Sequence, residues 1–167
     1  MAAAAAAPVR SYVDVAQEAV DYVKSKMTVG ALNKVPDVWK SKGESIVCVL
    51  AERSVTKQYE SVRIDHYLRF VAGAAEATGC GNCGEQSATA FVYLLDHGVR
   101  PPDWMALQDP GDHAFVVIGR LRNSIESEPE TWGDRAIVCD PWKGKVYSPR
   151  ELRRMWTYKP FSIYRKD

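Results

Sequence analysis

The sequence predicts an α+β fold in which helices come first and a small antiparallel sheet follows. Apolar residues recur at helical spacing in the first part of the chain, with polar residues on the opposite side. After Gly98, short apolar runs bounded by glycine and proline replace that pattern, as is typical of strands. No internal repeat is visible, so we expect one domain over residues 10–167, preceded by a flexible arm over residues 1–9.

The charge balance and composition exclude several classes of protein. Lys and Arg number 22 and Asp and Glu number 21, so the formal net charge of +1 argues against a general nucleic-acid binder. Hydrophobic residues make up 46% of the chain, which is too many for a disordered tail. No apolar run is long enough to predict a membrane span. The alanine-rich start lacks a basic region followed by a bulky apolar core, so no Sec signal peptide is expected.

Two helices are predicted before the glycine-rich segment at residues 79–81. The first runs from Tyr12 to Met27, where apolar residues fall on one face. Val35-Pro36-Asp37 then breaks the helical pattern. The apolar run Ile46–Leu50 is either a buried strand or part of a helix, because periodicity does not decide between them. The second helix is expected from Thr56 to about Ala77.

A third helix is predicted from Glu85 to Asp96, and His97 and Gly98 close it. We expect His97 to cap the carbonyl groups of that helix rather than to take part in catalysis. Pro101-Pro102 then predicts a loop.

Short strands and a last helix are predicted in the rest of the chain. The strands are expected at Ala114–Gly119, Ala136–Cys139 and Lys145–Tyr147. Ser148-Pro149 is typical of a helix start, with the proline at the first helical position.

Cys83 is the candidate nucleophile because of its place at the start of the third predicted helix. The free N–H groups and the positive end of the helix dipole favour a thiolate over a thiol. The same N–H groups can receive the oxyanion that develops during acyl transfer. Glycines at positions 81 and 84 allow a substrate backbone to come close.

His113 and Asp140 are the candidate partners of this cysteine. His113 precedes the first predicted strand, and Asp140 ends the next one. Antiparallel neighbours place the start of one strand beside the end of the other, so the carboxylate can hold one imidazole nitrogen. The other nitrogen is then free to face Cys83, which is the arrangement of nucleophile, base and orienting acid used in acyl transfer.

Each of these three residues also has a structural interpretation. A cysteine before a helix can be incidental, a histidine at a strand edge can simply be a satisfied polar residue, and Asp-Pro is a common turn. The competing class is therefore a binding or adaptor module in which the cysteine-rich turn only shapes the fold. The joint order of the three along the chain favours the triad.

The cysteine count indicates reduced thiols. Four cysteines, Cys48, Cys80, Cys83 and Cys139, are too few and too scattered for a disulfide framework. Cys80 and Cys83 form a C-x-x-C pair, but a zinc site needs a second pair and a thioredoxin-like redox site needs a preceding strand. Under oxidation, a Cys80–Cys83 disulfide would silence the nucleophile. No cofactor and no metal ion is expected.

Three tryptophans, Trp104, Trp132 and Trp142, fall in or near loops around the predicted cleft. They can line a substrate groove or fill the core beneath the loops. Trp104 and Trp142 are the candidates for substrate contact, and Trp142 is favoured because it follows Asp140-Pro141.

Three short blocks carry a resemblance to a known superfamily. Gly-Asn-Cys-Gly-Glu, Asp-His-Ala-Phe-Val-Val and Ile-Val-Cys-Asp-Pro-Trp resemble the papain-like and transglutaminase-like cysteine hydrolases, most closely the compact bacterial toxins and effectors among them. The resemblance covers residues 79–147 and implies a papain-like fold, with Cys83 as nucleophile, His113 as general base and acid and Asp140 as orienting carboxylate. Papain relatives supply a glutamine upstream of the nucleophile to the oxyanion hole. The nearest upstream glutamine in this chain, Gln58, is distant from Cys83 in the sequence. Asn82 or the backbone N–H of Cys83 would stand in.

The resemblance implies a thiol hydrolase that acts on an amide of a host protein. Attack on a glutamine side chain would be deamidation, and attack on a peptide bond would be proteolysis. A peptidoglycan amidase is a third alternative, although the usual motif of that group is absent. The partner would be a protein rather than a nucleic acid or a membrane, and the oligomeric state is left open. The implied route is the bacterial cytoplasm, export by a specialised secretion system, and then the host cytosol.

Overall fold

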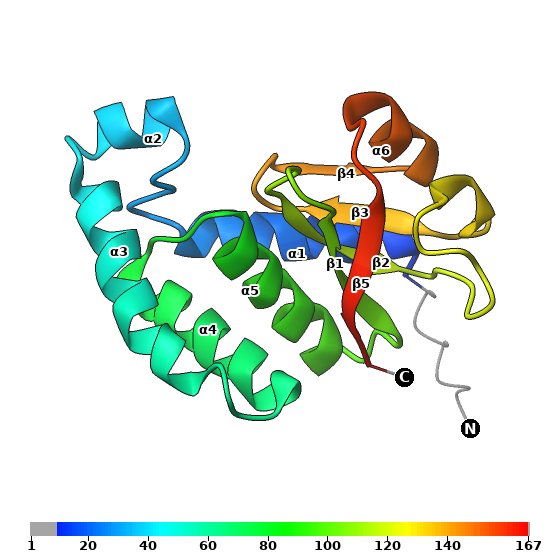
Figure 1. Ribbon diagram of the computed structural model, residues 1–167, viewed down its shortest axis with the longest axis horizontal. Helices are drawn as coiled ribbons and strands as arrows, with labels where there is room; N and C mark the ends of the chain where they lie inside the picture. Colours follow the sequence, from blue (N-terminus) through cyan, green and yellow to red (C-terminus); the bar gives the residue numbers. More distant parts are fainter. Residues whose placement is uncertain (1–9, 167) are drawn as a thin grey trace, which may run out of the picture.

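The helices precede most of the sheet along the chain, as expected for the α+β class. A computed structural model describes residues 10–166, and over these it has six α-helices and a five-stranded antiparallel sheet. Figure 1 shows the helices within residues 35–78 on one side of the molecule and the sheet with the helix of residues 149–155 on the other. The helices of residues 12–26 and 83–96, α1 and α5, lie against the sheet. The predicted arm over residues 1–9 lies outside the described residues.

The first helix, α1 (Tyr12–Lys26), forms where the sequence predicted it. Ser11 and Asp14 make a reciprocal capping box at its start, so two backbone N–H groups that the helix leaves unpaired have partners. Val15, Ala16, Ala19, Val20 and Val23 are its buried residues.

The segment between α1 and residue 83 contains more and shorter helices than the periodicity predicted. Val35-Pro36-Asp37 begins the short helix α2 (Val35–Lys40), because proline is well tolerated in a first helical turn. The ambiguous run Ile46–Leu50 belongs to helix α3 (Glu44–Thr56). The helix expected from Thr56 starts only at Ile64, after the 3-10 turn Lys57–Tyr59, and becomes α4 (Ile64–Thr78). Within residues 10–166, no helix has the length and apolar character needed to cross a bilayer.

The sheet has the strand order β4-β3-β2-β1-β5, with every neighbouring pair antiparallel. The predictions of β2 (Ala114–Ile118), β3 (Ile137–Asp140) and β4 (Lys145–Tyr147) are confirmed. The loop predicted at Pro101-Pro102 is wrong in part, because Pro102 opens β1 (Pro102–Leu107), a position where proline is tolerated in a strand. The strand β5 (Pro160–Arg165), which pairs with β1, was not predicted.

Both faces of the sheet are covered. Val116, Ile118 and Cys139 join the apolar faces of α1, α4 and α5 in one buried cluster. Phe115, Val117 and Val138 point the other way and join a second cluster that contains Trp132 and Leu152 of α6 (Pro149–Met155). Trp132 is completely buried there, so it fills the core and does not line a cleft.

A disulfide joins Cys48 of α3 to Cys80, which lies just before α5 (Cys83–Asp96). The prediction that all the thiols are reduced is therefore wrong for this pair. The two residues are 32 positions apart, and the packing of α3 beside the start of α5 brings their Cα atoms to 6.1 Å. Because Cys80 is bonded to Cys48, the C-x-x-C motif is not a pair of free thiols. Cys83 and Cys139 are free and buried.

Candidate active site

Cys83 is the first residue of α5, and its turn is built by its neighbours. The Glu85 carboxylate accepts a hydrogen bond of 2.8 Å from the backbone N–H of Asn82, the residue that caps the helix. Arg53 of α3 holds the same carboxylate with two hydrogen bonds of 2.7 and 3.1 Å. A Cβ at position 81 would lie 2.7 Å from the Cβ of Glu85, so only glycine fits there. The result is a rigid helix start with Cys83 only 7% exposed.

The structure brings His113 and Asp140 together. The β2–β3 register pairs Val116 with Cys139, which places the residue before β2 beside the residue that ends β3. His113 Nε2 and Asp140 Oδ2 are 2.8 Å apart, and the two side chains are 2% and 0% exposed. With Nε2 directed to the carboxylate, Nδ1 is the nitrogen that remains for Cys83.

Two further groups hold the Asp140 carboxylate. The Tyr147 hydroxyl donates to Oδ2 at 2.7 Å, and the backbone N–H of Lys143 donates to Oδ1 at 3.0 Å. Burial and the neighbouring Asp140 raise the pKa of the Tyr147 phenol far above its usual value, so Tyr147 stays a donor. The buried carboxylate of Asp140 therefore has three hydrogen-bond partners, which offset the cost of its burial.

Aromatic rings enclose the imidazole of His113. Trp156 stacks on it with ring centroids 4.7 Å apart and an interplanar angle of 22°. Trp142 meets it edge-on at 5.4 Å. Trp142 was predicted to contact substrate; it lies at the site but packs against the histidine. These two rings keep water from the His113–Asp140 pair, which strengthens the interaction between them.

The charged form of His113 is favoured by its partners. Burial lowers the pKa of the imidazole, but the hydrogen bonds with Asp140 and Cys83 and their negative charges outweigh it and raise the pKa to about 9. The imidazolium is therefore stabilised between a carboxylate and a sulfur atom. Cys139, the other free thiol, has its pKa raised far above the usual value by complete burial and by Asp140, so it stays neutral.

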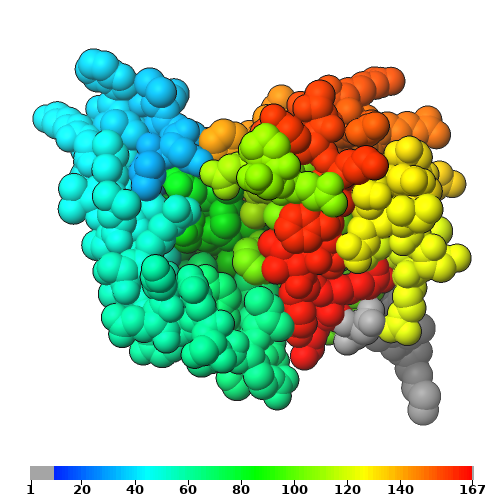
Figure 2. Space-filling view, viewed as in Figure 1, coloured from blue at the N-terminus to red at the C-terminus, as the bar shows by residue number. Residues whose placement is uncertain are grey.

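Cys83 and His113 face a common cleft of about 420 Å³, which Gly84, Gly111 and Phe161 also line. Figure 2 shows the green surface around α5 at the bottom of a hollow between the cyan helices and the strands opposite them. Gly111 has no room for a Cβ, which would lie 2.7 to 2.8 Å from Tyr158 and Leu107. The loop before His113 is thus packed from behind and open toward the cysteine.

The side chain of Asn82, the candidate oxyanion donor, binds the backbone of a neighbouring segment. Its Oδ1 accepts from the backbone N–H groups of Leu32 and Asn33 at 3.0 and 3.4 Å, so this side chain holds the 32–33 segment beside the cleft. Asn33 Oδ1 in turn accepts from the indole of Trp142 at 2.9 Å. The Glu85 N–H is paired with the Asn82 side chain in the capping box, whereas a helix gives the N–H groups of its first two residues, here Cys83 and Gly84, no backbone partner of its own, so these two can receive an oxyanion.

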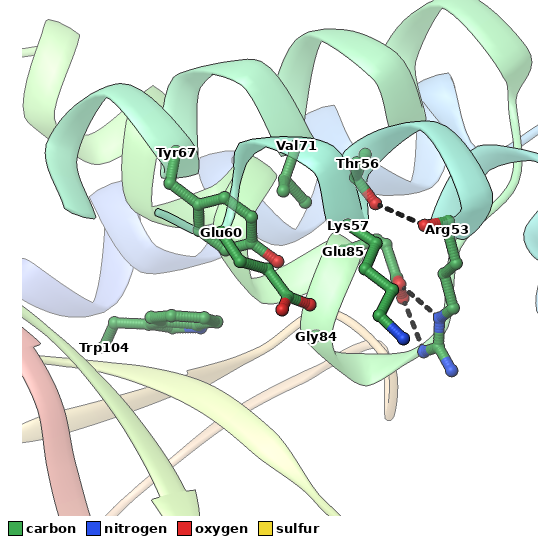
Figure 3. Close-up of a pocket in the computed structure, with 9 residues that line it drawn as sticks. All are labelled: Arg53, Thr56, Lys57, Glu60, Tyr67, Val71, Gly84, Glu85 and Trp104. Atoms are coloured by element: carbon green, nitrogen blue, oxygen red, sulfur yellow. Dashed lines mark hydrogen bonds and ion pairs between the residues drawn. The ribbon is translucent and has the colours of Figure 1, made fainter. Parts of the chain in front are cut away.

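The other predicted aromatic residue lies at a neighbouring cavity. Trp104 of β1 is fixed by a 2.8 Å hydrogen bond from its indole to Ser87. It lines a cavity of about 400 Å³ that shares Gly84 and Arg53 with the cleft of Cys83 and His113. Figure 3 shows this cavity, with the Trp104 ring at one end and Arg53 at the other.

Sequence reasoning missed four residues that build the site. Glu85 carried a detectable signal, since Asn82-x-x-Glu85 has the spacing of a capping box. Arg53, Tyr147 and Trp156 reach the site only through tertiary packing, and nothing in their local sequence marks them.

No protein-family model matches this chain, and no curated protein is found to be similar to it.

Proposed function

We propose that this chain is a papain-like amide hydrolase in which Cys83 is the nucleophile, His113 the general acid and base, and Asp140 the orienting carboxylate. The observation that carries the proposal is the buried 2.8 Å contact between His113 Nε2 and Asp140, which leaves the other nitrogen toward a cysteine at a helix start. If Cys83 were incidental, there would be no reason for the raised pKa of His113 or for the three hydrogen bonds to Asp140.

The proposed reaction has two halves. In the first, the Cys83 thiolate attacks the carbonyl carbon of an amide, and the N–H groups at the start of α5 receive the developing oxyanion. His113 gives its proton to the leaving nitrogen, the C–N bond breaks, and an amine or ammonia departs. In the second, His113 takes a proton from water, the resulting hydroxide attacks the thioester, and the carboxylic acid leaves as Cys83 is regenerated.

Two amide types fit this chemistry. A glutamine side chain would give a glutamate and ammonia, and a backbone amide would give a cut chain. From the resemblance to bacterial effectors, we propose that the amide belongs to a host protein and that the chain is exported from a bacterium into the host cytosol. The Cys48–Cys80 disulfide supports a route through an oxidising compartment, since cytosolic thiols are kept reduced.

The test compares the wild-type chain with Cys83→Ala in a eukaryotic cell lysate. Peptide masses raised by about 1 Da at glutamine identify deamidation, and new chain termini identify proteolysis. Either change should require Cys83, and Cys83→Ala should unfold at the wild-type temperature. Unchanged peptide masses and termini in both samples would contradict the proposal.

A labelling experiment separates the enzyme from a binding module. Iodoacetamide should modify the native chain once, at Cys83, because Cys139 is inaccessible and neutral and the other two cysteines are bonded to each other. The His113→Gln variant should slow this labelling near neutral pH. Equal labelling rates in the wild type and His113→Gln would show that the histidine does not activate the thiol.

A further inference from the structure

The cavity beside the nucleophile is lined by aromatic and charged side chains that have no role in the proposed reaction. It lies along α5, and Gly84, the residue after Cys83, belongs to both the cavity and the catalytic cleft. A substrate group that fills it would therefore sit close to the amide under attack. A volume of about 400 Å³ is within the range of sites that take one side chain or a small ligand.

One end of the cavity is lined by two aromatic rings and a carboxylate. Trp104 and Tyr67 are half-buried, and the hydrogen bond from Trp104 to Ser87 fixes the indole. Figure 3 shows the Glu60 carboxylate near the Tyr67 hydroxyl, to one side of the Trp104 ring. Burial is the largest cause of the raised pKa of the Tyr67 phenol, and the charge of Glu60 is the next, in agreement with the closeness of the two groups.

The Glu60 carboxylate is available to a ligand. Among residues 10–166 it has no ion-pair partner, although Lys57 is only one turn away. Figure 3 shows the Lys57 ammonium toward Arg53, at the other end of the cavity. The Arg53 charge is already matched by its two hydrogen bonds with Glu85. The unmatched charge at the aromatic end is therefore negative.

We propose that this cavity is a specificity subsite for a basic side chain, lysine or arginine, of a protein substrate. The cation would lie on the faces of Trp104 and Tyr67 and pair with Glu60, a combination of cation–π and ionic attraction. The inference rests on the proposed function, because it takes Cys83 as the point of attack. It narrows the substrate class to proteins with a basic residue near the attacked amide.

The test uses three benzyloxycarbonyl amino-acid chloromethyl ketones that differ only in side chain: lysine, norleucine and glutamate. The rate of mass gain at Cys83 is measured for each reagent, so no natural substrate is needed. We expect the lysine reagent to react about tenfold faster than the norleucine reagent, and the glutamate reagent to react slowest.

Two charge variants of an exposed residue make the test sharp. Glu60→Gln should reduce the lysine rate to the norleucine rate, and Glu60→Lys should make the glutamate reagent the fastest of the three. Glu44→Gln, at an equally exposed glutamate outside the cavity, should keep the wild-type order.

The outcomes for the two proposals are distinct. Equal rates for the three reagents would overturn the subsite and leave the reactive Cys83 in place, and so would a preference for glutamate in the wild type. If none of them modified Cys83 faster than a free cysteine in solution, the hydrolase proposal would fall. The subsite is then judged by binding, with N-acetyl-lysine methylamide expected to shift the indole NMR signal of Trp104 more than its norleucine counterpart does. An unshifted Trp104 signal would overturn it.

Discussion

Glu52 carries a buried carboxyl group. It is 4% exposed on α3, and neither carboxyl oxygen has a hydrogen-bond partner among residues 10–166. It borders an apolar hollow next to Cys48, Val55 and Ala74. Burial and the nearby Glu85 raise its pKa from 4.5 to about 8, and Arg53 opposes this only in part. We predict that Glu52→Gln removes a large pH dependence from the stability of the protein.

The magnitude follows from the two pKa values. A group whose pKa is higher in the folded state favours folding while it is protonated, and that contribution is lost as the pH rises. The loss begins near 4.5, the unfolded value, and is complete above about 8, where it amounts to about 5 kcal/mol. At pH 7 about 3 kcal/mol of it is already lost, a large part of the stability of a typical domain.

The assay is urea unfolding followed by tryptophan fluorescence at several pH values from 4.5 to 8. The buried amide of Glu52→Gln lacks partners at every pH, so it lowers the unfolding free energy of the variant by a constant amount. The quantity compared is therefore the change in unfolding free energy with pH. The wild-type curve should fall relative to the Glu52→Gln curve by several kcal/mol. Glu44→Gln removes an exposed carboxylate from the same helix and should keep the wild-type curve. Parallel curves for the wild type and Glu52→Gln would refute the reasoning.

Three further predictions concern the site and its supports. The pKa of His113 is raised from 6.5 to about 9, so its contribution to the unfolding free energy, about 3 kcal/mol, is complete below pH 6.5 and is lost as the pH rises to 9. In His113→Gln, the unfolding free energy should therefore change less with pH over that window. Replacing Cys48 and Cys80 together by alanine should cost about 3 kcal/mol in denaturant unfolding, while an unchanged midpoint would mean that the two thiols are not joined. Tyr147→Phe removes one donor from Asp140 and should slow Cys83 alkylation several-fold with a stability loss of about 1 to 2 kcal/mol, whereas equal alkylation rates would show that Tyr147 only fills space.

The α+β class and the region of the site could be predicted because both depend on local patterns. The helix at Tyr12 has a capping box and a continuous apolar face, and the start of α5 has glycines around a cysteine. The pairing of His113 with Asp140 follows from strand order alone, since each lies at the end of a recognisable apolar run.

The rest of the site depends on contacts between segments that are distant in sequence. Trp156 stacks on His113 from beyond α6, and no local pattern separates it from any other tryptophan after a helix. The Cys48–Cys80 bond depends on how α3 packs, which cysteine spacing does not encode. The strand β1 was missed because Pro101 and Pro102 favour a loop, while the pairing of β1 with two neighbours overrides that preference at Pro102.

The hydrogen bond between Asn33 and the indole of Trp142 fixes the ring that packs against His113. In the proposed reaction, the substrate and the water of the second half would share the cleft that Gly84 and Gly111 line. If a peptide bond is attacked, the departing segment would leave room in that cleft for the water. If a glutamine side chain is attacked, only ammonia would depart, and the rest of the substrate would stay attached through the thioester. The exposure of that glutamine on its own protein would then set how fast water reaches the thioester.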